Sequence, residues 1–236
     1  MNHESKASAD AAPAAPAARC AQAALSALPE VFTVRNVRRD FVEWHLGRPV
    51  YVLWALDFDT TAVLPRMQAA QAQLADLLLD GYTREPHITL SLCGFPSDSP
   101  VHTDDFGPEL IPAQVQAMQQ LRLAPFEIEI GGLDTFTSVP YFTVTETSGQ
   151  LAALRACLTA KGAQAASGDY VPHVTLGLYA DAWPLAAVQA RLRRCVLPEP
   201  VRVPVHGISL LSYQAADIGG VLSCLASYPF DGDRQR

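Results

Sequence analysis

The sequence has almost no lysine, and arginine supplies nearly all of its positive charge, yet acidic residues are in excess, and this net charge narrows the classes of function. Lys6 and Lys161 are the two lysines among 236 residues, and the net charge is −7. A protein that binds duplex nucleic acid without regard to sequence relies on many cationic contacts to phosphates, so this class is disfavoured. A small phosphorylated substrate, or an RNA end held in a local pocket, is compatible with the charge.

Long apolar runs are also lacking. No segment approaches the roughly 20 consecutive apolar residues that a membrane-spanning helix requires. Residues 1–20 lack the basic stretch and leucine-rich segment typical of a signal peptide. We therefore expect a cytoplasmic protein without a membrane partner.

The sequence also lacks clustered cysteines. The sequence contains no C-x-x-C pair and no cysteine–histidine cluster at the spacing typical of zinc sites. The cysteines are therefore expected to be small buried residues or unreacted thiols in a reducing compartment. They are scattered along the chain, at Cys20, Cys93, Cys157, Cys195 and Cys224.

The composition divides the chain into three parts. Residues 1–28 are rich in alanine and proline, cannot bury enough apolar surface to offset the entropy of ordering, and are predicted to be a disordered tail. Residues 29–49 are mixed in character and are predicted to form a short helix or an arm over the domain. Residues 50–231 have the composition of a globular domain, which we expect to be a monomer.

Hydrophobic periodicity predicts alternating strands and helices within this domain. Strands are predicted at 50–59, 87–95, 171–179, 201–213 and 223–230, with two more inside 125–147. Helices are predicted at 61–81, 112–123, 149–162 and 185–195. Paired strands with helices between them are typical of an α+β fold in which helices cover one side of the sheets.

One short pattern occurs twice, as PHITL at residues 86–90 and as PHVTL at residues 172–176. Alternate residues of a strand share a face, so His87 lies beside Thr89, and His173 lies beside Thr175. Residue frequencies predict about 0.1 chance matches to H-x-[ST]-L, and two proline-preceded copies are about a hundred-fold less expected. We therefore interpret the pair as one site in which the two motifs face each other across a cleft.

The paired motifs resemble those of the 2H phosphoesterase superfamily, and the layout looks most like its bacterial 2′-5′ RNA ligase/RNA 2′,3′-cyclic phosphodiesterase group. The resemblance covers residues 50–230 and leaves the N-terminal extension outside it. It implies two pseudo-symmetric lobes, each an antiparallel sheet with helices packed on its outer face, and a central cleft between the sheets. It also implies hydrolysis of a 2′,3′-cyclic phosphate on an RNA end or a small nucleotide, with possible reversal as 2′-5′ ligation. No metal and no other cofactor is implied.

The residue types suit this chemistry. Opening a cyclic phosphodiester with water needs a base for the water and an acid for the departing ribose oxygen, on opposite sides of phosphorus. Histidine can perform either task near neutral pH, and threonine hydroxyls can donate hydrogen bonds to the non-bridging oxygens. The resemblance implies that His87 is the acid and His173 the base. The residues themselves leave that assignment open, and the ligation direction exchanges the two roles.

Other functions fit the same motifs. The substrate could instead be a cyclic dinucleotide, a 2′-5′-linked oligoadenylate or a cyclic ADP-ribose phosphate. A nucleotide-binding module without turnover would be a different class of protein. Because both motif histidines are present, catalysis is favoured over the module.

A few residues outside the motifs are secondary candidates. Arg84, close before the first motif, is a candidate phosphate contact. His45, His102 and His206 lack the hydroxyl and leucine at motif spacing and are expected to be structural. Aromatic residues are candidates for base stacking, although each is more often part of a core: Tyr51, Trp54, Tyr141, Tyr170 and Tyr179.

Overall fold

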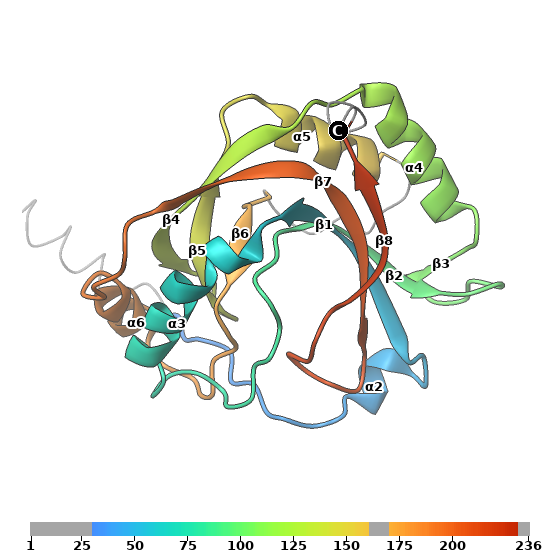
Figure 1. Ribbon diagram of the computed structural model, residues 1–236. Coiled ribbons are helices and arrows are strands. Elements are labelled where there is room, and N and C mark those ends of the chain that lie inside the picture. The colour runs from blue at the N-terminus through green and yellow to red at the C-terminus, as the bar shows by residue number, and fades with distance from the viewer. Residues whose placement is uncertain (1–29, 161–169, 231–236) are drawn as a thin grey trace, which may run out of the picture. The chain divides into compact units, whose positions relative to one another are not determined.

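The computed structural model describes residues 30–160 and 170–230 (Figure 1). The chain divides into two units, Met1–Val31 and Phe32–Arg236, and the helices and strands of the described residues belong to the second. The predicted tail at residues 1–28 and the end of the helix predicted at 149–162 lie outside the described residues.

Eight strands of the described residues form one hydrogen-bonded sheet, with the order β3-β2-β1-β7-β4-β5-β6 and with β8 paired to β7. Neighbouring strands are antiparallel except for the parallel pair β2–β3. The strands are β1 (Val50–Phe58), β2 (Thr89–Pro96), β3 (Asp105–Phe106), β4 (Phe126–Thr135), β5 (Pro140–Thr145), β6 (His173–Thr175), β7 (Val201–Gln214) and β8 (Ser223–Pro229).

The long strand β7 joins the two halves of this sheet. Its residues 201–205 pair with β4, and its residues 205–214 pair with β1. Residues 207–212 also pair with β8. The family resemblance implied one sheet for each of two lobes. The structure joins the strands of both halves into one sheet, in which β7 pairs with β1 and with β4.

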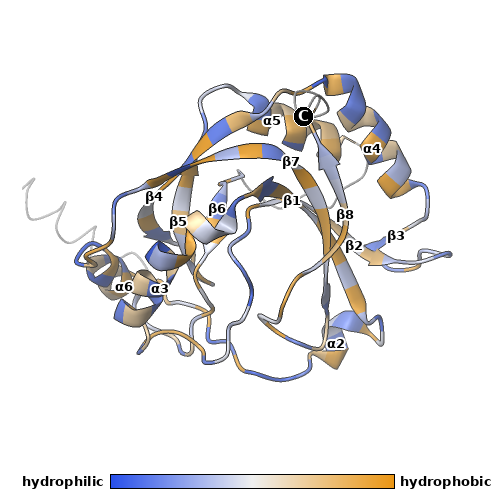
Figure 2. Ribbon diagram, in the orientation of Figure 1, coloured by the Kyte–Doolittle hydropathy of each residue, from blue (hydrophilic) through white to orange (hydrophobic). Residues whose placement is uncertain are grey.

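Four helices pack on one face of the sheet, which confirms the predicted α+β class. Apolar residues from all four belong to the same buried cluster as Trp54 of β1 and Leu210 of β7. Helix α3 lies beside α6, and α4 lies beside α5 (Figure 1). Figure 2 shows apolar and polar residues alternating along α4 and β7, as elements with one buried face require. The helices are α3 (Leu64–Gln73), α4 (Leu110–Leu121), α5 (Gln150–Thr159) and α6 (Leu185–Leu192).

The opposite face of the sheet carries a smaller aromatic cluster. Tyr51 and Phe95 are buried there, with Tyr213 packed against them. Tyr51 alternates along β1 with Val52 and Trp54 of the main core, which places it on the other face. The short helix α2 (Val42–His45) covers this second cluster, because Trp44 packs on Tyr51 and Phe95 with ring centroids 5.4 and 5.2 Å apart.

The segment before β1 crosses from one half of the sheet to the other. Near its start, the Thr33 amide donates to the carbonyl of Trp183 at 2.9 Å, and the Asn36 amide donates to the carbonyl of Tyr179 at 2.9 Å. Its far end is α2, beside β1 and β2. The segment is therefore part of the structure of the Phe32–Arg236 unit.

The helix predicted at 61–81 is wrong in its length. A 3-10 turn occupies Thr60–Ala62, and α3 ends at Gln73. Residues 77–79 pair instead with the chain that follows the second motif: the Leu79 amide donates to Leu178, and the Ala180 amide donates to Leu77. Because these backbone groups are satisfied by strand-like pairing, the helical spacing of the leucines does not extend the helix.

The two histidine strands are shorter than predicted. The first begins at Thr89, so His87 lies just before β2 rather than inside it. The second comprises His173–Thr175 alone, because the Leu176 amide donates to Pro140 and the chain then leaves β5 to reach residues 77–79.

Candidate active site

Both motifs have the alternation that the sequence predicts. Their apolar residues are fully buried in the main core: Ile88, Leu90, Val174 and Leu176. Their polar residues are half-buried and point away from that core: His87, Thr89, His173 and Thr175.

The two histidine rings are held by the same contact. Nδ1 of His87 lies 2.9 Å from the carbonyl oxygen of Glu85, and Nδ1 of His173 lies 2.7 Å from that of Val171. A carbonyl oxygen only accepts, so Nδ1 carries the proton in each ring. The neutral form of each ring therefore offers Nε2 as the atom that accepts or returns a proton.

His87 is electrostatically coupled to the second motif. Burial lowers the pKa of His87 to about 4, the hydrogen bond to Glu85 acts in the opposite direction, and the charges of Arg84 and His173 lower it further. In the ligand-free protein His87 is neutral at pH 7.

A pocket of about 310 Å³ connects the two motifs. His87 of the first motif and Thr175 of the second both line it, together with Arg84. Thr89 and His173 are not among the described residues that line this pocket. The structure thus brings one residue of each motif to a common cavity, with the remaining two beside them on β2 and β6.

Aromatic residues support the second histidine. Phe136 meets the His173 ring edge-on with centroids 5.1 Å apart, and Tyr141 lies 5.3 Å from it. Phe136 and Tyr141 stack on each other at 4.3 Å. With Nδ1 bound to a carbonyl and two rings beside it, the imidazole of His173 has little freedom to turn.

Arg84 lies next to His87 at the pocket wall. Its Nε donates to the carbonyl of Gly220 at 3.1 Å, and its guanidinium covers the ring of Tyr213 at 4.3 Å from the centroid. Within the described part of the chain, no carboxylate lies at ion-pair distance from this guanidinium. Arg84 can therefore meet an anion that enters the pocket.

Most of the aromatic residues proposed from the sequence belong to the core. Tyr51, Trp54, Tyr141 and Tyr179 are each at most 4% exposed. Tyr170 is half-buried, and its hydroxyl donates to the backbone carbonyl of Thr89 at 2.8 Å. The aromatic residues that do line the pocket were missed in the sequence: Phe41, Trp44, Tyr82 and Tyr213. The sequence signal for the first two is that the mixed segment at residues 29–49 contains three large aromatic residues, Phe32, Phe41 and Trp44.

Three further observations concern the rest of the molecule. His45 is buried and lies 2.7 Å from a carboxylate oxygen of Asp40, as a structural histidine would. Among the described residues, no group of three or more His, Cys, Asp or Glu side chains is arranged to hold a metal ion. None of the helices in the same residues is long and apolar enough to cross a membrane.

An α+β sheet that carries two H-x-T-L strands beside one pocket defines the class of 2H phosphoesterases. The chain belongs to the 2′-5′ RNA ligase superfamily, whose family model matches residues 60–217. The segment that contains α2 precedes the matched residues. No curated protein sequence matches the chain.

Solved structures with a similar fold include two bacterial proteins. One is E. coli LigT complexed with 3′-AMP, at 14% identity and a TM-score of 0.51, covering 78% of this chain and 99% of LigT. Another is TT0787 of Thermus thermophilus, at 18% identity and a TM-score of 0.52, covering 78% of this chain and 99% of that one. At these identities the likeness concerns the fold.

Proposed function

We propose that the protein hydrolyses 2′,3′-cyclic phosphodiesters, on RNA ends or on small nucleotides, and leaves a 2′-phosphate. The observation that carries this proposal is the matched pair of histidines, each with Nδ1 bound to a backbone carbonyl two residues earlier and Nε2 left for proton transfer. Membership of the superfamily supports phosphoesterase chemistry on RNA or nucleotides. LigT, which shares the fold, has been crystallised with 3′-AMP, and this supports a nucleotide as the substrate.

The reaction assigns one proton transfer to each histidine. The oxygen of a water molecule forms a bond to phosphorus while one histidine takes the proton of that water. The bond between phosphorus and O3′ breaks on the opposite side, and the other histidine gives its proton to the departing oxygen. Following the family resemblance, His173 is the base and His87 the acid. The hydroxyls of Thr89 and Thr175 donate to the non-bridging oxygens, where negative charge increases.

The low pKa of His87 is compatible with the acid role, because a bound phosphodiester favours protonation of the ring. Burial, assisted by the positive charge of Arg84, lowers the pKa of this ring to about 4. A bound phosphodiester adds a negative charge beside the ring, which favours the protonated form and raises the pKa. His87 then receives its proton when the phosphate arrives.

A substrate panel tests the proposal. Purified protein is incubated with 2′,3′-cyclic AMP, an RNA that ends in a cyclic phosphate, a 2′-5′-linked dinucleotide and a cyclic dinucleotide, and products are identified by phosphorus NMR. We expect 2′-phosphates from the first two. Cleavage of one of the other two alone would move the substrate class, and nucleotide binding without turnover of any substrate would favour a binding module.

A further inference from the structure

We propose that α2, which precedes the residues matched by the family model, forms a nucleobase subsite for the substrate pocket. The base stacks on Phe41 and Trp44, and its cyclic phosphate lies toward Arg84 and His87. The inference rests on the proposed function, because it concerns the substrate of the same pocket.

Aromatic residues and a cationic residue line the same pocket. Phe41 and Trp44 line the pocket from α2 and the residue before it, while Arg84 and His87 line it from the chain before β2. Planar aromatic side chains are the groups on which proteins stack nucleobases, and arginine is suited to phosphate. This pairing matches the two chemical ends of one nucleotide.

Trp44 has the exposure that stacking requires. Its ring packs on Tyr51 and Phe95, which fixes its position, yet the residue remains 39% exposed. A tryptophan that served the core alone would be covered, as Trp54 is at 0% exposed. The open surface of Trp44 is therefore available to a planar ligand.

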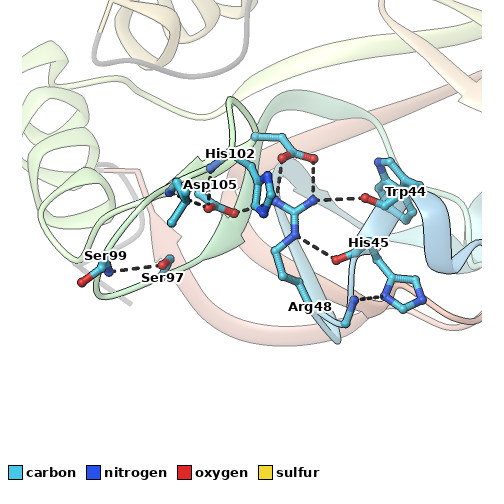
Figure 3. A network of polar contacts seen from close by, with 10 residues as sticks. Trp44, His45, Arg48, Ser97, Ser99, His102 and Asp105 are labelled. Carbon is cyan, nitrogen blue, oxygen red and sulfur yellow. Dashed lines mark hydrogen bonds and ion pairs between the residues drawn. The ribbon is translucent and has the colours of Figure 1, made fainter.

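Arg48 holds α2 in place. Its guanidinium donates to the carbonyls of Trp44 and His45 at 3.1 and 2.9 Å, and to carboxylates of Asp104 and Asp105 at 2.6 Å each (Figure 3). A helix of four residues is not stable by itself, so these contacts help to hold α2, and with it Trp44, in position. Contacts within the protein therefore fix the position of Trp44 at the pocket.

A second arginine ties the same segment to the other walls of the pocket. Arg38 donates to the carbonyls of Asp80 and Gly81 and pairs with a carboxylate oxygen of Asp217 at 3.4 Å. Gly81 immediately precedes Tyr82, and both Tyr82 and Asp217 line the pocket. The segment before β1 thus forms one side of the pocket that His87 and Thr175 also line.

The size of the pocket sets the substrate class. At about 310 Å³ it lies at the small end of the range of roughly 300–1,000 Å³ that ligand pockets occupy. One nucleotide unit fits this description better than several. On an RNA substrate, we therefore expect α2 to contact only the terminal nucleotide that carries the cyclic phosphate.

Two substrates and three variants test the subsite. Phe41→Ala and Trp44→Ala are compared with the control Val42→Ala, which changes an exposed residue of α2 outside the pocket. The substrates are 2′,3′-cyclic AMP and the base-free glycerol 1,2-cyclic phosphate. We expect each aromatic variant to raise KM for cyclic AMP by about 5-fold to 150-fold, the loss typical of a stacked base, with kcat little changed. Neither should alter turnover of the base-free substrate, and Val42→Ala should match the wild type on both.

Binding measurements separate the failure of this inference from the failure of the proposed function. Calorimetry with adenosine 2′-monophosphate gives Kd for each variant without any turnover. If the wild type hydrolyses cyclic AMP but both aromatic variants keep its KM and Kd, the subsite is wrong and the function stands. If nothing is hydrolysed, the proposed function is wrong, and an unchanged Kd in the variants would also overturn the subsite.

Two controls keep the test decisive. Trp44→Leu retains apolar packing on Tyr51 and Phe95 while removing the ring, and it replaces Trp44→Ala if the alanine variant is unfolded. An RNA that ends in a cyclic phosphate should show the same loss as cyclic AMP. A loss confined to the RNA would mean that α2 contacts neighbouring nucleotides, which contradicts the proposal.

Discussion

At the residue scale, His87 and His173 are matched in contact but not in surroundings. We expect His87→Ala and His173→Ala each to lower kcat by about 10² or more, because each removes one proton-transfer partner. Thr89→Val and Thr175→Val should lower it about 10-fold to 100-fold, as lost donors to the phosphate oxygens. Steady-state kinetics on 2′,3′-cyclic AMP measures these effects.

The control for this series is His102→Ala, since His102 is exposed and lies outside the pocket. It should keep wild-type activity. All four site variants should keep near-native Tm values, because their side chains are half-buried and point away from the main core. Unfolded variants, or histidine variants with full activity, would make the motifs structural.

The depressed pKa of His87 also affects stability. Its pKa is about 4 in the folded protein against an ordinary value of 6.5, so between these values the unfolded chain binds more protons at this residue. The free energy of unfolding should therefore rise with pH across this window and fall as the solution is acidified toward pH 4. Urea denaturation from pH 4.5 to 7 measures the slope. His87→Gln should make it shallower, and an unchanged slope would show that His87 does not carry the effect.

At the element scale, sequence patterns predicted what local periodicity controls and missed what tertiary pairing controls. The continuous apolar and aromatic run correctly placed β1, because this strand is buried on both of its faces. The helix from residue 61 was extended too far because leucine spacing carries no information about residues 77–79 pairing with the chain after Thr175. The position of α2 at the pocket was not predictable either, because its four residues are held by Arg48 and, through it, by distant partners such as Asp104.

Arg48 is the contact through which α2 depends on the rest of the fold. Arg48→Ala removes hydrogen bonds to two backbone carbonyls and ion pairs with Asp104 and Asp105. We expect a Tm lower by about 5 °C and a higher KM for 2′,3′-cyclic AMP, with kcat less affected. Thermal denaturation and steady-state kinetics measure the two effects.

Arg202→Ala is the control for Arg48. It breaks the exposed pairs of Arg202 with Glu127 and Glu129, away from the pocket, and pairs of this kind contribute little to stability. Its Tm and KM should equal those of the wild type. Arg48→Lys should not restore the native values, because an ammonium group cannot reproduce the planar fork of the guanidinium. Full rescue by lysine would mean that charge alone holds α2.

At the scale of the whole molecule, the duplicated motif was the most informative part of the sequence. Two short patterns, at residues 86–90 and 172–176, identified the family and named His87, Thr89, His173 and Thr175 as candidates. The walls of their pocket could not be found in the same way. Phe41, Tyr82 and Tyr213 meet only after the chain has folded, and their spacing in the sequence carries no common signal.

Metal and pH together separate a two-histidine mechanism from metal-dependent phosphodiesterases. We predict activity that survives exhaustive EDTA treatment and is not raised by magnesium, manganese or zinc. One histidine must be neutral and the other protonated, so kcat/KM should trace a bell against pH whose limbs belong to the coupled pair. Assays with chelator, with each metal and across pH provide the measurement. Activity that EDTA abolishes and metal restores would contradict the mechanism.

The shared strand β7 has a consequence for how His87 and His173 are held relative to each other. His87 lies just before β2, two strands from β7 on one side, and His173 lies in β6, three strands from it on the other. Strands β2, β1, β7, β4, β5 and β6 are hydrogen-bonded in series between them, so the distance between the two rings depends on the fold of the whole sheet. For the proposed mechanism, the entropic cost of bringing the two histidines together is therefore met when the chain folds. Activity and native structure should consequently disappear in a single urea transition. Activity lost well before the fluorescence change would show that the two histidines can move apart while the sheet remains folded.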